Sequence, residues 1–88
     1  MTRQEIQDNI LGIFARQFEI ADPKLDDDLR EVHEFDSIDA IDLLSEIEKM
    51  LNSELSQNEK KQAMGIRTIN QICDYVENLA RARGLAAA

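Results

Sequence analysis

A serine directly after an aspartate, Asp36-Ser37, stands where a strongly periodic apolar and polar pattern begins. Serine is common at helix starts because its side chain can cap the exposed backbone amides there. Aspartate caps equally well, and Asp36 already occupies the capping position. The Ser37 hydroxyl is therefore not needed for the cap, and other chemistry at this residue has to be considered.

A catalytic serine would require a base and a shaped turn. His33 is the one histidine of the chain, and it precedes Ser37 by four residues. No Gly-x-Ser-x-Gly turn surrounds the serine, which disfavours a hydrolase. His33 has no second ligand of metal-binding type near it, and Cys73 falls on the apolar stripe of a predicted helix, where a buried structural thiol is expected. Neither residue predicts a site.

The run Asp26-Asp27-Asp28 has the composition of a calcium loop without its spacing. The sixth position counted from Asp26 is Glu31 rather than glycine, and the alternation of ligands fails. A solvated loop is the expectation, and no metal site is predicted. Weak divalent-cation binding to the clustered carboxylates of the following helix would stabilise the fold without acting as a cofactor.

The net charge of −8 is concentrated in the middle of the chain. Residues 1–25 carry three basic and four acidic residues, residues 26–59 two and twelve, and residues 60–88 five and two. Such an acidic segment repels nucleic acid and anionic lipid and attracts basic protein surfaces. A single cysteine, no signal-peptide pattern and no apolar run of about 18 residues favour a cytoplasmic protein without membrane insertion.

Four helices are expected from apolar periodicity and capping pairs. The first covers about 3–18 after a Thr2/Glu5 capping box, and the second about 37–51 after Asp36. A short third helix follows Ser56/Glu59 and reaches Met64, closed by Gly65 in the left-handed conformation; a fourth follows Thr68/Gln71 and ends near Gly84.

Between Glu19 and Phe35 the helical periodicity lapses, and Pro23 blocks a helix. A long loop is expected here, pinned at intervals by isolated apolar residues: Leu25, Leu29, Val32 and Phe35. The expected fold is an all-α, small four-helix bundle with three main helices, one short helix and a long first loop. Residues 1–84 are expected to form one domain, with 85–88 as a frayed tail.

The segment Asp36-Ser37-Ile38 resembles the Asp-Ser-Leu motif of acyl carrier proteins, which lies, as here, at the start of the second helix. The order of elements resembles that family over nearly the whole chain. It includes the long loop before the motif, the acidic helix after it, the short third helix and the final helix with Tyr75.

This resemblance implies that a phosphopantetheinyl transferase attaches a 4′-phosphopantetheine arm to the Ser37 hydroxyl through a phosphodiester. Acyl groups would then be carried on the thiol of the arm as thioesters, so the chain would be a carrier and not an enzyme. Acidic residues would dock on basic patches of the transferase and of acyl-processing enzymes; they are Asp36, Asp39, Asp42, Glu46 and Glu48.

The resemblance also implies an apolar space between the helices that shelters the acyl chain of a monomeric carrier. Each buried methylene would contribute about 0.8 kcal/mol. The expected lining is Ile41, Leu44, Ile47, Met64, Ile69 and Val76.

Two departures from the family pattern lie close to the motif. The family usually has Leu-Gly and one further residue before Asp-Ser, whereas this chain has His33-Glu34-Phe35, with Glu34 in place of the glycine. Ser45 and Lys49 replace an apolar residue and an acid on the second helix. These changes favour a specialised carrier of fatty-acid, lipid or polyketide biosynthesis over the main fatty-acid carrier.

Two alternatives stay open. An unmodified helical adaptor, binding a basic partner through its acidic second helix, explains the charge distribution equally well. A peptidyl carrier is a further possibility, but those proteins usually have Gly-Gly-His before the serine, and Asp36 favours the acyl class.

Overall fold

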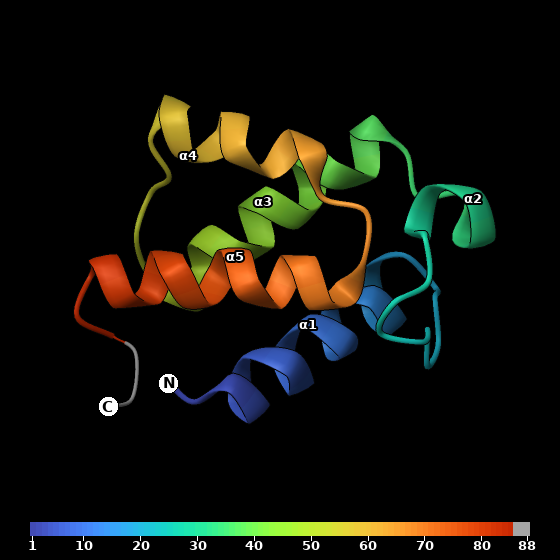
Figure 1. Cartoon of the computed structure of the whole chain (residues 1–88), viewed down its shortest axis with the longest axis horizontal. Helices are drawn as coiled ribbons and strands as arrows, with labels where there is room; N and C mark the ends of the chain where they lie inside the picture. Colours follow the sequence, from blue (N-terminus) through green and yellow to red (C-terminus); the bar gives the residue numbers. More distant parts are fainter. Residues whose placement is uncertain (86–88) are drawn as a thin grey trace.

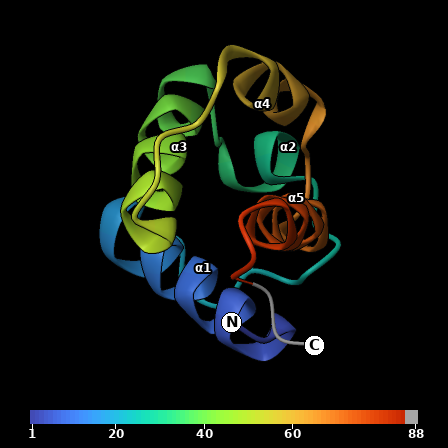
Figure 2. The same ribbon diagram turned by 90° about the vertical axis from the view of Figure 1, so that its left-hand side faces the viewer.

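The computed structural model describes residues 1–85, and that part of the chain is helical without a strand. Its elements are α1 (Arg3–Gln17), α2 (Leu29–His33), α3 (Ser37–Leu51), α4 (Gln57–Gln62), the 3-10 turn η1 (Ala63–Gly65) and α5 (Ile69–Ala82). The all-α bundle of three main helices and a short one is confirmed. In Figure 1, α4 lies above α5, α1 lies below it, and α3 runs behind them; Figure 2 shows α4 and α5 on the same side of α3.

The three predicted capping boxes are all present. In each box, two residues exchange hydrogen bonds between side chain and backbone; the pairs are Thr2 with Glu5, Ser56 with Glu59, and Thr68 with Gln71. Such a box satisfies two amide groups that a helix start leaves without partners. Because this interaction is local, the starts of α1, α4 and α5 could be predicted from sequence alone.

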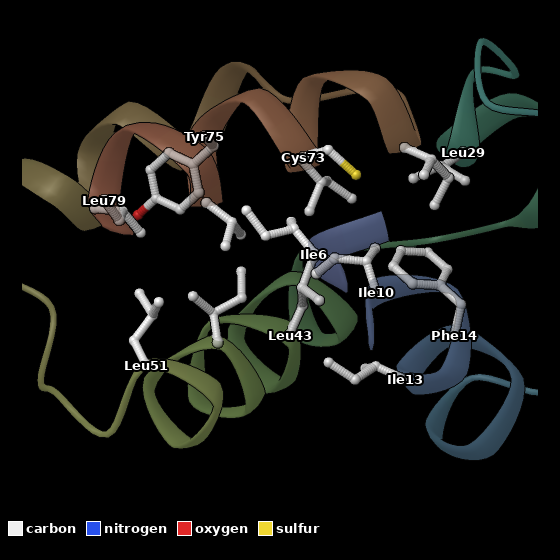
Figure 3. Packing of buried hydrophobic residues seen from close by; sticks show 14 of the residues in the cluster. Ile6, Ile10, Ile13, Phe14, Leu29, Leu43, Leu51, Cys73, Tyr75 and Leu79 are labelled. Atoms are coloured by element: carbon white, nitrogen blue, oxygen red, sulfur yellow. The ribbon is translucent and has the colours of Figure 1, made fainter. Parts of the chain in front are cut away.

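The core lies between α1, α3 and α5, whose apolar side chains meet in one cluster (Figure 3). Ile6, Ile10 and Phe14 come from α1, while Ile72 and Val76 come from α5, and all five have no exposed surface. Viewed from the end of the bundle, α1, α3, α4 and α5 surround this interior (Figure 2). Arg3 adds a polar tie between α1 and α5 through Asp74 (2.6 Å) and Glu77 (3.0 Å).

The predicted long loop contains a helix that the periodicity did not indicate. α2 begins after Asp28, whose carboxylate accepts hydrogen bonds from the amides of Arg30 and Glu31 (3.0 and 3.1 Å). Leu29 is buried, and its amide donates to the Arg67 carbonyl (2.8 Å). A helix of five residues is too short to show a periodic pattern, and this contact with a distant residue helps to hold it.

Two expectations about this region and the helix ends were wrong. Val32 does not pin the loop, because it lies on the outer side of α2 and is 57% exposed. Gly65 does not take the left-handed conformation; it ends η1, and the chain continues through an extended Ile66. Gly84, in contrast, has φ +70° just beyond α5, as the predicted helix stop requires.

The chain end after α5 is fastened to its beginning in the described part. The Leu85 amide donates to the Ala80 carbonyl (2.7 Å), and the Met1 ammonium donates to the Leu85 carbonyl (2.8 Å). The rest of the expected frayed tail, residues 86–88, lies outside the described residues. No helix among residues 1–85 is long and apolar enough to cross a membrane.

Candidate functional site: an exposed serine beside an apolar cavity

Ser37 is the first residue of α3, and its side chain is exposed. The cap of α3 is made by its neighbours: Asp36 accepts from the Asp39 amide (2.9 Å), and Asp39 accepts from the Asp36 amide (3.2 Å). This fourth capping box leaves the Ser37 hydroxyl out of the capping interactions. A hydroxyl at the first turn of a fifteen-residue helix is thus presented to solvent by a rigid element.

This position suits a phosphodiester. The first turn of a helix exposes amide groups and the positive end of the helix dipole, which favour an attached anion. The carboxylates of Asp36 and Asp39 oppose this effect locally, although each is already engaged with a backbone amide. The residues present therefore fit a phosphate-linked group on Ser37.

Glu34 turns the chain between α2 and α3. Its φ and ψ of 56° and 31° are left-handed, a conformation that glycine adopts far more readily. The acyl carrier proteins that this sequence resembles usually have glycine at this position. The turn lets the Phe35 amide donate to the Leu29 carbonyl (3.0 Å) and directs Phe35 into the core, so the unusual conformation sets the chain path into Asp36.

Phe35 fixes the segment before Ser37 to α1. Its ring stacks on Phe14 with centroids 5.1 Å apart and meets Phe18 edge-on at 5.2 Å. Phe35 is 7% exposed, so it is a core residue, as expected of an apolar residue that pins the loop. The site serine is therefore held from both sides, by α3 and by this aromatic anchor.

The three consecutive aspartates each have a separate structural partner. Asp26 accepts from the Asn70 side chain (2.7 Å), and Asp27 contacts His33 Nε2 (3.2 Å). Asp28 caps α2, so the run is more ordered than a solvated loop. Within residues 1–85, no three acidic, histidine or cysteine side chains gather in a way that could hold a metal ion.

A cavity of about 390 Å³ lies beside Ser37, between α3 on one side and α4 with η1 on the other. Its apolar lining includes four of the six residues predicted for an acyl-chain site. These are Ile41, Leu44, Ile47 and Met64. Ser37 itself is part of the lining, so a group attached to the hydroxyl has direct access to the cavity.

The other two predicted lining residues lie elsewhere. Ile69 and Val76 have no exposed surface and belong to the core cluster. Ile72 and Tyr75, from the same helix α5, line the cavity instead. Periodicity identifies the apolar stripe of α5, but it does not tell which part of that stripe meets α1 and which part meets the cavity.

The acidic residues of α3 have different environments. Asp42 is exposed, whereas Glu46 accepts from the Gln17 amide group (2.9 Å) and Glu48 accepts from the Leu55 backbone amide (2.8 Å). The outward stripe of α3 is shared with apolar side chains, since Ile38 and Ile41 are 69% and 65% exposed.

α4 is held on the bundle by polar contacts to Glu59. Arg83 donates to both Glu59 carboxylate oxygens (2.8 Å each), and the Tyr75 hydroxyl donates to the Glu59 carbonyl (2.6 Å). The hydrogen bond from Arg83 lowers the pKa of Glu59 to about 2, with a further contribution from the Ser56 amide. Burial of the ring raises the pKa of Tyr75 to about 12, so its hydroxyl remains a donor.

Cys73 lies in the core without exposed surface, and burial raises the pKa of its thiol. It is a structural residue, as expected. The cavity lining contains three basic residues that were not predicted: Arg30, Lys60 and Lys61. Lys60 and Lys61 could have been placed on one helix face from the sequence, because they follow Gln57 by three and four residues.

The family comparison agrees with this geometry. Residues 8–76 match the family model of the phosphopantetheine attachment site, which covers more than half of the chain and includes Ser37, α3 and α4. No curated protein and no solved structure is significantly similar to the chain. The chain therefore belongs to the phosphopantetheine attachment site family, whose members are non-catalytic carrier proteins with a covalent 4′-phosphopantetheine.

Proposed function

We propose that Ser37 is the attachment residue and that the chain carries acyl groups as thioesters for enzymes of fatty-acid, lipid or polyketide biosynthesis. The observation that carries this proposal is the position of the Ser37 hydroxyl, which is exposed at the start of α3 and borders an apolar cavity. The arm supplies a terminal thiol for the thioester. The protein supplies the anchor, the cavity and the surface that partners recognise.

The cavity supports an acyl cargo on energetic grounds. Moving methylene groups from water to an apolar surface is favourable by about 0.8 kcal/mol each. Leu44 and Ile47 provide such a surface on α3, and Met64 provides it on η1. Met64 is 74% exposed, so a chain that enters beside it would cover an apolar side chain that now faces solvent.

Docking of the transferase and of acyl-processing enzymes would use the acidic surface around Ser37. Asp36 precedes Ser37 in the chain, Asp42 follows it, and both are exposed. Asp39 lies between these two residues. Glu46 and Glu48 contribute charge to this surface while they hold internal hydrogen bonds. Exposed Ile38 and Ile41 add an apolar contact, so a partner with an apolar centre and a basic rim fits.

Intact-mass measurement after coexpression with a broad-specificity phosphopantetheinyl transferase tests the attachment. Wild type should gain the mass of one phosphopantetheine, and Ser37→Ala should gain none. Ser45→Ala is the matched control, because Ser45 is also exposed on α3 and lines the same cavity. It should be modified like wild type.

An unmodified wild type, or an adduct that survives in Ser37→Ala, would overturn the assignment of Ser37. An adaptor without the arm would give no adduct and would bind its partner equally well before and after transferase treatment. The same mass spectra therefore separate the carrier from the adaptor.

A further inference from the structure

The side of α4 that borders the cavity is polar, where an amphipathic helix would be apolar. Gln57, Lys60, Lys61 and, in the following η1, Met64 line the cavity at positions i, i+3, i+4 and i+7. This spacing marks the inward stripe of a helix packed on a core, which is ordinarily hydrophobic. No residue of α4 is buried. The helix therefore places two lysines beside an apolar space.

The charge of the lining is opposite to the charge of the chain. Arg30, Lys60 and Lys61 are the three basic residues of the lining, and Glu48 is its one acidic residue. One carboxylate oxygen of Glu48 accepts from the Leu55 amide at 2.8 Å. No ion pair within residues 1–85 joins any of the three basic side chains to a carboxylate. The cavity thus carries a local excess of positive charge in a chain of net charge −8.

We propose, on the basis of the proposed carrier function, that the cargo is an acyl chain that ends in a carboxylate. Its methylene groups would contact the apolar wall of α3, and its terminal anion would pair with Lys60 and Lys61. A purely hydrocarbon chain would gain nothing from the two ammonium groups, whereas an anionic end would meet two cations that form no ion pair within residues 1–85.

A second anion could meet the same lysines, namely the phosphodiester of the arm on Ser37. Ser37 and Glu48 mark the two ends of the lining on α3, about 16 Å apart along the helix axis. The lining lysines belong to α4, while the lining residue of α2 is Arg30. We assign the lysines to the cargo, and the experiment separates the two anions.

The test compares three cargoes of matched chain length on the wild-type carrier: octanoyl, suberoyl with a terminal carboxylate, and 8-aminooctanoyl with a terminal ammonium. Each is loaded by transferase from the corresponding coenzyme A thioester and verified by intact mass. Two readouts follow, the rate of thioester cleavage by hydroxylamine and the amide hydrogen exchange of residues 57–65. Suberoyl should be cleaved about two- to fivefold more slowly than octanoyl, and 8-aminooctanoyl should be the fastest.

The double variant Lys60→Gln/Lys61→Gln should remove the difference between suberoyl and octanoyl. Lys24→Gln is the control, since Lys24 is exposed outside the cavity lining, and it should keep that difference. Equal behaviour of suberoyl and octanoyl in wild type would overturn the proposal. A second outcome would also overturn the proposal: loading with octanoyl slows the amide exchange of residues 57–65 in wild type but not in the double variant. The lysines would then be assigned to the phosphodiester of the arm.

A failure of the carrier function has a different signature, because the mass of the protein then never changes on transferase treatment. The charge preference is still decided in that case by titrating the unmodified protein with octanoate and with octylamine. Octanoate should shift the amide resonances of residues 57–65 in wild type and not in the double variant. Equal shifts from octylamine would contradict an anion site.

Discussion

Glu34 shows how one residue before Ser37 shapes the candidate site. Its left-handed backbone directs Phe35 inward and Asp36 into the capping position of α3. For a residue with a Cβ this conformation costs about 1–2 kcal/mol, and glycine avoids most of that cost. Glu34 is exposed, so its side chain contributes little packing that would compensate.

We therefore expect Glu34→Gly to be more stable than Glu34→Ala by about 0.5–1 kcal/mol, after allowance for the greater freedom of glycine in the unfolded chain. Both variants remove the same carboxylate, so the comparison isolates the backbone. Urea unfolding gives the free energies. At Glu31, inside α2, the order should reverse, because glycine weakens a right-handed helix. Equal stability of the two Glu34 variants would show that the turn is not strained.

For single residues, the sequence predicts those parts of the site that depend on interactions between near neighbours in the chain. Asp36 and Ser37 could be placed because a capping residue acts on amides two or three positions away. The partners of Glu46 and Glu48 could not be predicted, because Gln17 and Leu55 reach them only when α1 and the loop after α3 have packed. Exposure of individual acids on α3 depends on these contacts.

Among the elements, α4 has a polar attachment and no buried residue. Its Glu59 is held by Arg83, which also donates to the Ser53 hydroxyl (2.8 Å) and the Glu54 carbonyl (3.0 Å). Arg83 thus joins the end of α5 to the α3–α4 connection as well as to α4. A helix held in this way should open more easily than the core helices.

Arg83→Met should lower the free energy of unfolding at pH 7 by about 1–2 kcal/mol and speed amide exchange in α4. The pKa of Glu59 is depressed to about 2 in the folded protein, so the pair stabilises fully above the ordinary value of 4.5. As the pH falls from about 4.5 toward 2, Glu59 becomes protonated and the difference between variant and wild type should shrink. Urea unfolding across this range measures it.

Arg81→Met is the control for that experiment, because Arg81 forms an exposed pair with Glu77 on a single helix. It should change stability by less than about 0.5 kcal/mol. A constant difference between Arg83→Met and wild type from pH 7 to pH 2.5 would mean that the effect comes from lost packing of the arginine stem rather than from the ion pair.

The lengths of the helices explain why the three main helices could be predicted from the sequence and α2 could not. α1, α3 and α5 have fourteen or fifteen residues each, long enough for periodicity and capping to agree. α2 has five, and its buried Leu29 could be read only as an isolated apolar residue in a loop. Its hydrogen bond to Arg67 links positions far apart in the chain.

For the whole molecule, the distribution of charge matters more than its sum. The net charge of −8 attracts basic partners from a distance, and this attraction is screened within about 10 Å at 0.1 M salt. Contacts at the docking surface act at shorter range and depend on which residues the partner touches, so they show where the docking surface lies. Asp42 and Asp8 allow these contributions to be separated, because both are exposed and each can lose one negative charge.

Asp42 lies five residues beyond Ser37 on α3, whereas Asp8 lies on α1, outside the cavity lining and the docking surface. Asp42→Asn should raise the KM of the carrier for the transferase about two- to fivefold at 25 mM NaCl with little change in kcat, since an exposed charge pair contributes up to about 1 kcal/mol. Asp8→Asn should leave KM within experimental error.

At 300 mM NaCl the difference between Asp42→Asn and wild type should largely disappear, because screening weakens exposed pairs. Steady-state kinetics of phosphopantetheine transfer at both salt concentrations provide the measurement. Equal effects of the two substitutions would mean that the transferase responds to the total charge of the carrier, and the docking surface around Ser37 would lose its support. An effect confined to Asp42 would place the partner on the outward stripe of α3, beside Ser37.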